Sequence, residues 1–252
     1  VLELWHGPTS AFKDMALQLL PQLMSAAREK MGARDTILIL VATSGDTGKA
    51  ALEGFADAPG IRMMVFYPDG GVSPVQRLQM VTQEGANVSV VAVRGNFDDA
   101  QRGVKEIFGD AAAQKELAVS HTRLSSANSI NWGRLVPQIV YYFSSYADLL
   151  AEGRISLGDA VNYTVPTGNF GDILAGFYAK RMGLPVGRLV CASNANNVLT
   201  DFLQSGIYDR RRAFYQTISP SMDILVSSNL ERLLYHLTED TAQVAVWMRE
   251  LT

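Results

Sequence analysis

The sequence is poor in cysteine and histidine and has no long apolar stretch. A single cysteine, Cys191, stands among 252 residues, so no disulfide can form within the chain and a cytoplasmic, reducing location is expected. The three histidines and the cysteine do not cluster with the spacing of metal ligands, so no metal site is predicted. The longest largely apolar runs, such as 37–42 and 88–93, have the length of strands and are too short to span a membrane.

An excess of charge of either sign is also missing. The chain has 22 Lys and Arg against 25 Asp and Glu, which gives a net charge of -3, and it has no basic run. Nucleic acid and membranes are therefore not expected as partners, since both attract strongly basic surfaces or long apolar segments. The expected partner is a small-molecule substrate, for a protein that acts as a monomer or a homodimer.

Strand-sized apolar runs alternate with segments of helical periodicity along the whole chain. This alternation predicts an α/β protein with mostly parallel sheets, whose ligands bind at the carboxyl ends of the strands. The loops that follow strands are therefore the first place to look for a site. The strand-like runs cover residues 36–43, 62–67, 88–93, 118–120, 162–166 and 188–192, and the helical segments cover residues 15–31, 49–58, 73–82, 96–108, 132–152 and 172–182.

The loop after the first strong strand is rich in small hydroxyl residues and glycine, and it opens a helix. Backbone N–H groups at such a position suit a carboxylate or a phosphate. A Walker A loop would need glycine at position 43 and Ser or Thr at position 50, where this chain has Thr43 and Ala50. A simple helix N-cap is the alternative interpretation. The residues concerned are Thr43, Ser44, Gly45, Asp46, Thr47, Gly48 and Lys49.

Two further loops have the composition of anion sites. The loop 167–172 places two glycines before a helix but lacks the dinucleotide fingerprint, so a single phosphate is the predicted ligand and a tight turn the alternative. The loop 125–134 contains three serines, two asparagines and Arg134, whose guanidinium could hold a phosphate ester. A polar boundary loop with an N-cap explains that composition equally well.

A lysine follows a Gly-Pro turn near the start of the chain, in His-Gly-Pro-Thr-Ser-Ala-Phe-Lys-Asp at 6–14. Lys13 stands behind Phe12, where the turn passes into a largely apolar helix. A lysine that loses water at such a position has a lowered pKa, and its neutral amine can form a Schiff base. The alternative is an ordinary surface lysine near a helix start.

Together these motifs resemble the threonine synthases, which belong to the tryptophan-synthase-β-like (fold type II) pyridoxal phosphate enzymes. The resemblance extends over nearly the whole chain, and the segments 6–14 and 128–134 together are specific to threonine synthases. It implies two open, mostly parallel twisted sheets flanked by helices, and pyridoxal 5′-phosphate as the cofactor. The matching segments are residues 6–14, 42–48, 128–134, 168–172 and 221–229.

The resemblance also implies a role for each segment. Lys13 would form the Schiff base with the cofactor and carry protons, with Phe12 beside it. The residues implied to bind the cofactor phosphate are Gly168, Asn169, Phe170, Gly171 and Asp172. Those implied to hold the substrate carboxylate and flank the cofactor are Thr43, Ser44, Gly45, Asp46 and Thr47, and those implied for the substrate phosphate are Ser125, Asn128, Asn131 and Arg134.

The implied reaction converts O-phospho-L-homoserine and water to L-threonine and phosphate by γ-elimination and β-hydration. Such an enzyme is a carbon–oxygen lyase of threonine biosynthesis. One alternative is another fold-type-II lyase, such as an amino-acid dehydratase, which has no use for the loop 128–134. The other is a non-catalytic phosphoester-binding homologue, against which the presence of Lys13 argues.

The family pattern further implies three segments. Residues 1–33 and 132–252 would belong to a large cofactor-binding domain, and residues 34–131 would form a smaller mobile α/β domain. The hydroxyl residue that faces the pyridine nitrogen in the family comes from a C-terminal region with no match here. Because the chain also begins at Val1 instead of methionine, we expect it to be a fragment that lacks N- and C-terminal regions.

Overall fold

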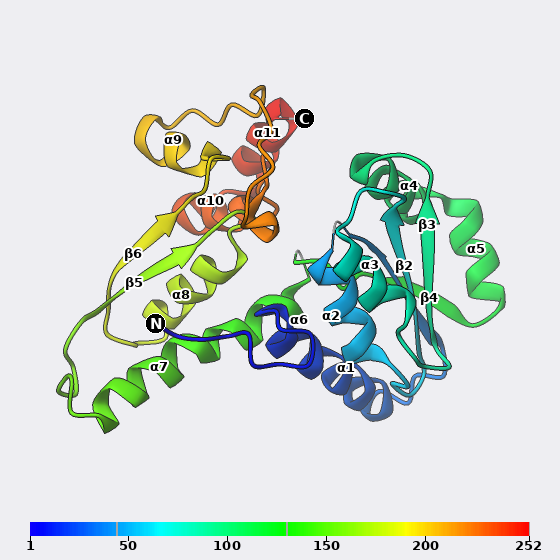
Figure 1. The fold of residues 1–252 in the computed structure, drawn as a ribbon, viewed down its shortest axis with the longest axis horizontal. Coiled ribbons are helices and arrows are strands. Elements are labelled where there is room, and N and C mark those ends of the chain that lie inside the picture. The colour runs from blue at the N-terminus through cyan, green and yellow to red at the C-terminus, as the bar shows by residue number, and fades with distance from the viewer. Residues whose placement is uncertain (44, 130, 252) are drawn as a thin grey trace. The chain divides into compact units, whose positions relative to one another are not determined.

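The protein forms two compact units, Val1–Arg134 and Leu135–Thr252 (Figure 1). The computed structural model describes residues 1–43, 45–129 and 131–251. Each unit contains a parallel sheet with helices packed on it, which confirms the predicted α/β fold. Among the described residues, no helix combines the length and the apolar composition that a bilayer crossing requires.

The first unit is built on a four-stranded parallel sheet in the order β3-β2-β1-β4. The central strand β1 pairs Ile39 with Met63 of β2 on one side and with Ser125 of β4 on the other. The elements are α1 (Lys13–Lys30), β1 (Thr36–Ala42), α2 (Asp46–Phe55), β2 (Ile61–Pro68), α3 (Pro74–Val81), β3 (Val88–Val93), α4 (Phe97–Gly109), α5 (Ala111–Val119), β4 (Thr122–Ser125) and α6 (Trp132–Leu135).

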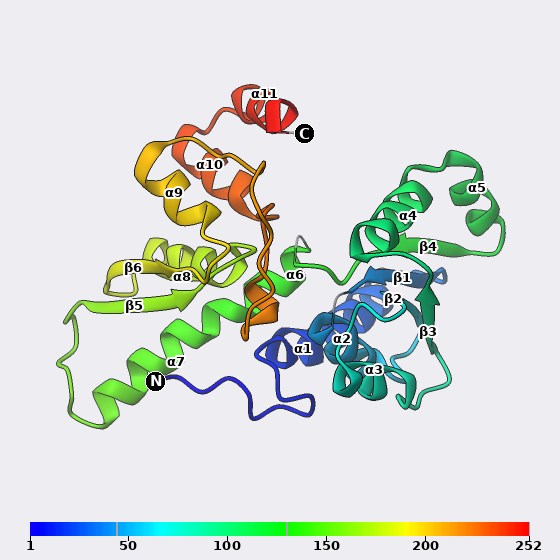
Figure 2. The ribbon, with the colours of Figure 1, turned by 45° about the horizontal axis from the view of Figure 1, so that its top comes forward.

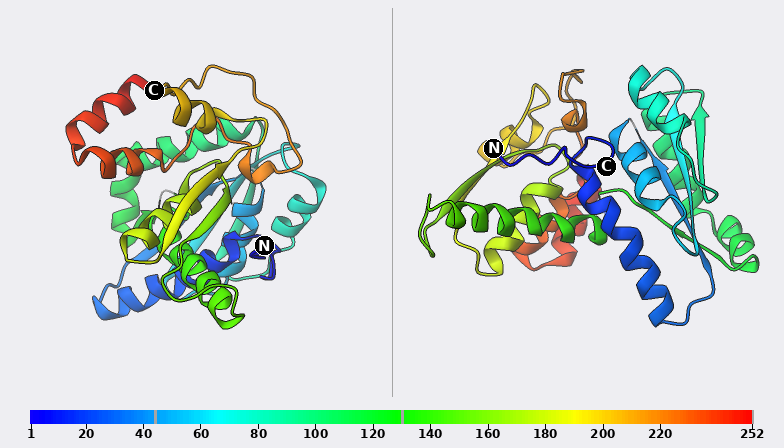
Figure 3. Two further views of the ribbon diagram at one scale, coloured as in Figure 1. Left: turned by 90° about the vertical axis from the view of Figure 1, so that its left-hand side faces the viewer. Right: turned by 60° about the horizontal axis from the view of Figure 1, so that its bottom comes forward.

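The two faces of this sheet carry separate apolar cores, because the side chains of β1 alternate between them. Ile39 and Val41 pack into the core that includes Leu17 of α1, Leu52 and Phe55 of α2. On the opposite face, Leu40 and Ala42 pack with Ala100 and Val104 of α4. Helices pack on the strands of this sheet (Figure 3). Burial on both faces explains why β1 is continuously apolar, as a central parallel strand should be.

The second unit contains a two-stranded parallel sheet, β5 with β6. The helices α7 and α8 lie side by side next to these strands (Figures 1 and 2). Gly176 allows this approach, since a Cβ there would lie 2.7 Å from Cε1 of Tyr142. The elements are η1 (Val136–Gln138), α7 (Ile139–Ala151), β5 (Val161–Pro166), α8 (Gly171–Arg181), β6 (Val186–Ala192), α9 (Val198–Ser205), η2 (Pro220–Met222), α10 (Leu230–Thr238) and α11 (Thr241–Leu251).

Two of the elements expected from the sequence are wrong in detail. Residues 118–120, predicted as a strand, end α5 instead, because the Asp110 carboxylate caps an alanine-rich helix that reaches Val119. The strand follows at Thr122–Ser125. The helix predicted over 132–152 is divided into α6, η1 and α7, since Pro137 lacks a backbone N–H and disfavours helical geometry in the residue before it.

The division into a large domain (1–33 with 132–252) and a smaller mobile domain (34–131) stays a prediction. Within the first unit, α1 packs directly on α2, where the carbonyl oxygen of Leu17 would lie 2.1 Å from a Cβ at Gly54. Residues 1–33 are therefore part of the same compact body as the four-stranded sheet.

Candidate active site

The turn before Lys13 is closed by the carboxylate of Asp14. Asp14 is almost fully buried and accepts hydrogen bonds from the Thr9 backbone N–H (2.9 Å) and the Thr9 hydroxyl (2.5 Å). Gly7 is needed here because a Cβ would lie 2.5 Å from Oδ2 of Asp14. The Gly-Pro turn thus folds back on the first turn of α1 and fixes where Lys13 begins the helix.

Lys13 is buried, with only 7% of its surface exposed, so it is not the ordinary surface lysine that the sequence left open. Its Nζ lies 3.4 Å from Oδ2 of Asp46 and 5.7 Å from the centre of the Phe12 ring. Burial lowers the pKa of Lys13 below its usual value, the Arg134 cation lowers it further, and the Asp46 carboxylate opposes both. At a given pH, a larger fraction of Lys13 is therefore in the neutral amine form than of a lysine in water.

The loop after β1 is shaped by Thr43. Its buried hydroxyl accepts hydrogen bonds from the backbone N–H groups of Gly45 and Gly48, both at 3.0 Å. Gly45 has a φ of 154°, and a Cβ there would lie 2.3 Å from Nε2 of Gln76, so both the conformation and the contact require glycine. The Thr43 hydroxyl therefore stabilises the conformation of the loop. Ser44 lies outside the described residues, and Thr47 stands in the first turn of α2.

Asp46 is held between Lys13 and a residue that the sequence analysis missed. Gln76 of α3 donates from Nε2 to Oδ1 of Asp46 (2.8 Å), which leaves Oδ2 turned toward Lys13. Gln76 is itself placed by a capping box with Ser73 at the start of α3. The Ser-x-x-Gln spacing predicts that cap, but its contact with Asp46 spans 30 residues and no local pattern indicates it.

The loop 125–134 is held largely by its own polar groups. Ser125 ends β4. Asn131 donates to the carbonyl oxygen of Ser126 (2.7 Å) and accepts from the backbone N–H of Gly133 (2.9 Å). Arg134 is buried and donates from Nη1 to the carbonyl oxygen of Ala127 (2.7 Å). The side-chain oxygen of Asn128 is buried and has no hydrogen-bond partner among the described residues.

The predicted phosphate loop of the second unit joins β5 to α8. Phe170 adopts a left-handed conformation (φ 65°), which is uncommon for a large residue and reverses the chain into the helix. The backbone N–H of Gly171 donates to the side-chain oxygen of Asn169 (2.8 Å). The N-cap residue Phe170 makes no side-chain hydrogen bond to the first turn of α8, and the start of such a helix suits an anion. The role of this loop in binding a phosphate stays a prediction.

Asp172 adds an acid to the start of this helix. The Tyr142 hydroxyl donates to its backbone oxygen (2.8 Å) and to Oδ1 (3.1 Å). Burial raises the pKa of Asp172 to about 6, and the Tyr142 hydrogen bond only partly opposes that shift. The carboxyl is therefore partly protonated near neutral pH, which weakens its repulsion of a bound anion.

Residues 222–229 also reach the phosphate loop. A Cβ on Gly168 would lie 3.1 Å from both the Cα and the backbone oxygen of Met222. The Asn229 backbone N–H donates to the carbonyl oxygen of Asn169 (3.1 Å), and its side chain donates to the same oxygen (3.2 Å). The sequence matched this segment to the family without giving it a place in the site.

In the first unit the structure thus brings together Lys13, Asp46 and Gln76, with the Arg134 charge acting on Lys13. In the second unit it brings together the phosphate loop and the segment 222–229. The roles predicted for the individual residues stay predictions.

Comparison with known proteins shows which proteins the chain is similar to. The chain is 48% identical over 251 residues to threonine synthase-like 1 of Homo sapiens, which covers 97% of this chain and 33% of that protein. It is 48% identical over 237 residues to the threonine synthase of Pseudomonas aeruginosa, which covers 94% of this chain and 48% of that protein. The chain therefore spans about half the length of that threonine synthase and a third of the human relative.

Solved structures give the same answer for the fold. A PLP-bound threonine synthase from Brucella melitensis matches with a TM-score of 0.88 at 47% identity, covering 100% of this chain and 52% of that chain. The yeast threonine synthase matches with a TM-score of 0.86 at 42% identity, covering 99% and 50%. These neighbours confirm the predicted fold class. A family model described as pyridoxal-phosphate dependent enzyme matches residues 2–251, and the chain belongs to that family.

Proposed function

We propose that this chain carries the lysine and the phosphate loop of a PLP-dependent threonine synthase. The reaction converts O-phospho-L-homoserine and water to L-threonine and phosphate. The observation that carries the proposal is the buried Lys13 beside Asp46, in a chain 48% identical to a threonine synthase. A lysine buried without a chemical use would be costly, since removing its ammonium from water is unfavourable.

The described residues fit pyridoxal phosphate. Lys13 is a desolvated amine with a lowered pKa, as attachment to an aldehyde requires. The loop 168–171 leads into a helix that Phe170 does not cap, which suits a phosphate group. We therefore assign Lys13 to the covalent attachment of the cofactor and residues 168–172 to its phosphate.

Bound pyridoxal phosphate would supply an electron sink for negative charge that develops next to the substrate amino group. The protein has to move the protons. Nζ of Lys13, when neutral, can accept a proton from carbon and later return it, and its lowered pKa keeps the neutral form accessible. Asp46, oriented by Gln76, holds Nζ in one position between these transfers.

The remaining predicted contacts concern the substrate. The backbone N–H groups of Asp46 and Thr47, in the first turn of α2, suit the substrate carboxylate, whereas the Asp46 side chain faces Lys13. For the substrate phosphate we propose Arg134 and the polar loop 125–131 before it. Arg134 supplies a fixed positive charge at that end of the loop.

The assay also has to test a second candidate reaction. The chain is as similar to threonine synthase-like 1 as to a threonine synthase, at 48% identity in both cases. The same lysine and loops could therefore serve a related phosphoester substrate or a dehydration. We further propose that the protein is cytosolic, because a single cysteine is typical of a reducing compartment. We also propose that it acts as a monomer or a homodimer.

The test is covalent trapping of the cofactor. Protein mixed with PLP should gain a visible absorption band, and borohydride should fix the pyridoxyl group on Lys13, as located by peptide mass spectrometry. Lys13→Ala should lose the label, whereas Lys49→Ala, which removes a lysine paired with Glu53, should keep it. Label on another lysine in the wild-type protein would refute the assignment.

Product analysis then separates the reactions. Release of phosphate from O-phosphohomoserine with formation of threonine supports the synthase. Formation of a keto acid from serine or threonine, without phosphate release from O-phosphohomoserine, would show a dehydratase instead. Phosphate release with another product would point to the related phosphoester reaction.

A further inference from the structure

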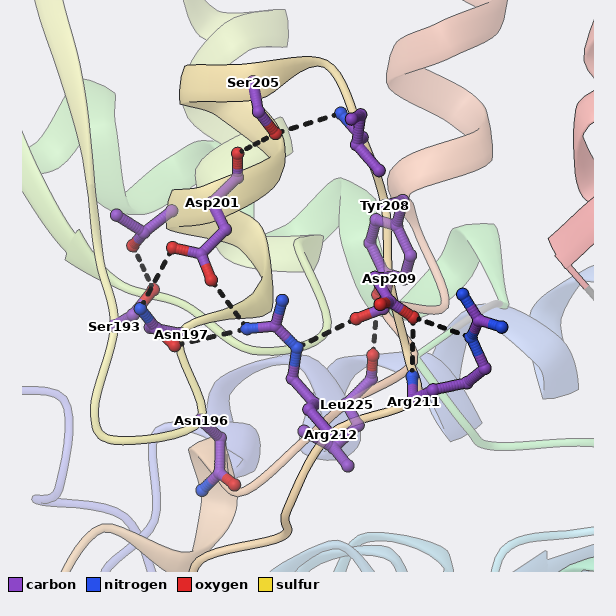
Figure 4. Close-up of polar contacts among 12 residues, drawn as sticks. Ser193, Asn196, Asn197, Asp201, Ser205, Tyr208, Asp209, Arg211, Arg212 and Leu225 are labelled. Atoms are coloured by element: carbon purple, nitrogen blue, oxygen red, sulfur yellow. Dashed lines mark hydrogen bonds and ion pairs between the residues drawn. The ribbon is translucent and has the colours of Figure 1, made fainter.

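The segment between α9 and α10 is fastened in place by side chains along its length. Arg212 pairs with Asp201 of α9 (2.7 Å), as Figure 4 shows. The carboxylate of Asp223 accepts hydrogen bonds from the backbone N–H of Thr217 (2.9 Å) and from the side chain of Asn194 (2.7 Å). This segment of irregular backbone therefore has a defined position in the second unit.

The same segment packs against the phosphate loop at two points. The backbone of Met222 lies close to Gly168, where a Cβ would make a tight contact of 3.1 Å with it. Asn229, which is fully buried, donates twice to the carbonyl oxygen of Asn169. The second contact joins the start of α10 to the loop that starts α8.

This junction brings two helix N-termini to the same loop. The N-terminal ends of α8 and α10 both carry partial positive charge. Each helix has one acidic residue in its first turn, Asp172 in α8 and Glu231 in α10, and an anion bound beside the two ends would stabilise them further. The contact between Asn229 and Asn169 thus places the two ends where both would favour a bound anion.

Ser227 supplies an independent observation. Its side chain is 4% exposed, and its hydroxyl oxygen is buried with no hydrogen-bond partner among the described residues. Its backbone is held by Tyr208, whose hydroxyl accepts from the Ser227 N–H (2.8 Å) and donates to the Leu225 carbonyl oxygen (2.9 Å; Figure 4). A positioned hydroxyl that is buried and unpaired costs free energy unless a ligand completes its hydrogen bonds.

We propose that the Ser227 hydroxyl is a ligand of the phosphate monoester bound at the start of α8, and that residues 222–229 form a second wall of that phosphate site. This inference rests on the proposed function, because the cofactor phosphate is the monoester expected there. Tyr208 acts as a positioning residue, since it holds the Ser227 backbone without reaching the ligand itself.

The test compares PLP with pyridoxal, which lacks the phosphate, by equilibrium dialysis. Ser227→Ala should weaken PLP binding by roughly 10- to 100-fold, as expected for a lost hydrogen bond to a charged group, and leave pyridoxal binding unchanged. Tyr208→Phe should weaken PLP binding selectively by several-fold. Ser219→Ala, an exposed hydroxyl of the same segment, is the control and should change neither.

A second readout does not depend on activity. If the hydroxyl is unpaired without the cofactor, cofactor-free Ser227→Ala should unfold at the same or a higher urea concentration than the wild type. If the hydroxyl instead makes a structural hydrogen bond, for example to an internal water, Ser227→Ala should unfold at a lower urea concentration than the wild type. Lower stability with unchanged PLP affinity would overturn the proposal.

The two proposals fail in different ways. Borohydride should still label Lys13 in Ser227→Ala at saturating PLP, because the lysine is untouched. If the wild type labels Lys13 but Ser227→Ala binds PLP normally, only the inference about Ser227 fails. If the wild type does not label Lys13, the proposed function fails, and binding of inorganic phosphate, followed by its phosphorus resonance, still decides whether Ser227 is an anion ligand.

Discussion

The two units position their candidate site residues by different means. In the first, Lys13 begins a helix whose Leu17 lies in the apolar core beneath β1. In the second, the phosphate loop is braced by hydrogen bonds and backbone contacts from a segment with little regular structure. A cavity should therefore disturb the lysine most, whereas the loss of a polar group should disturb the phosphate loop most.

Each unit also contains an ionisable candidate site residue whose charged form is disfavoured by burial. Burial lowers the pKa of Lys13 and raises that of Asp172. Each shift favours the neutral form. The Asp46 carboxylate beside Lys13 favours the charged form of the lysine, whereas the Asp172 carboxylate accepts a hydrogen bond from the neutral Tyr142 hydroxyl.

The largest effect is expected from a cavity in the first unit. Leu17→Ala should reduce the free energy of unfolding by about 2–5 kcal/mol, because the side chain is fully buried between α1 and the sheet. Hydrogen exchange should accelerate in β1 and β2 more than in β5 and β6. The control is Leu19→Ala on the same helix, where the leucine is 42% exposed and a change within about 0.5 kcal/mol is expected. Equal losses from the two variants would contradict the comparison.

A smaller effect, of opposite sign, is expected from Asp172→Asn. The folded pKa of about 6 lies above the unfolded value of 3.8, so the folded state binds more protons between these pH values. Stability should therefore fall as the pH rises from about 4 to 6, by at most about 3 kcal/mol. Asparagine keeps an oxygen for Tyr142 and cannot ionise, so the variant should be more stable at neutral pH.

Urea unfolding across this pH range measures the effect. The Asp172→Asn variant should show a flatter dependence of stability on pH than the wild type. Asp148→Asn, an exposed aspartate on α7, should keep the wild-type dependence. A variant at position 172 with an unchanged slope would show that its carboxyl ionises as freely as an exposed one.

The sequence predicts the parts of both units that depend on local pattern. The run 37–42 is apolar on both faces and is the central strand, and the glycine loop at 168–171 opens α8. What it does not predict are contacts between distant residues. Gln76 reaches Asp46 across 30 residues and Asn229 reaches Asn169 across 60, and no spacing rule connects such positions.

The segment 221–229 shows the same limit in another form. The chain there forms the short helix η2 and then turns. Its conformation is set by Asp223 and by Tyr208, whose partners come from other parts of the unit. Where polar contacts between distant residues determine the backbone conformation, the periodicity of the local sequence cannot predict that conformation.

Asp223 tests the polar half of the comparison. Asp223→Asn loses one of the two carboxylate oxygens that accept from Thr217 and Asn194, so we expect a loss of about 1–3 kcal/mol within the second unit. The amide hydrogens of Thr217 and Asn229 should exchange faster, with β1 unaffected. Asp209→Asn, a partly exposed carboxylate of the same segment that pairs with Arg211, should leave both amides at wild-type rates. Faster exchange in β1 would show that the units are not independent in this respect.

The smallest effect is expected from a polar contact of the first unit. Ser73→Ala removes the hydroxyl that accepts from the Gln76 backbone N–H at the start of α3, and a lost N-cap costs about 1 kcal/mol. Because Gln76 also donates to Asp46, amide exchange in the loop 45–47 should rise slightly. Ser25→Ala, a partly exposed serine on α1, should have no such effect. A loss at Ser73 as large as that from Leu17→Ala would mean that polar contacts hold the lysine side of the site as firmly as its apolar core does.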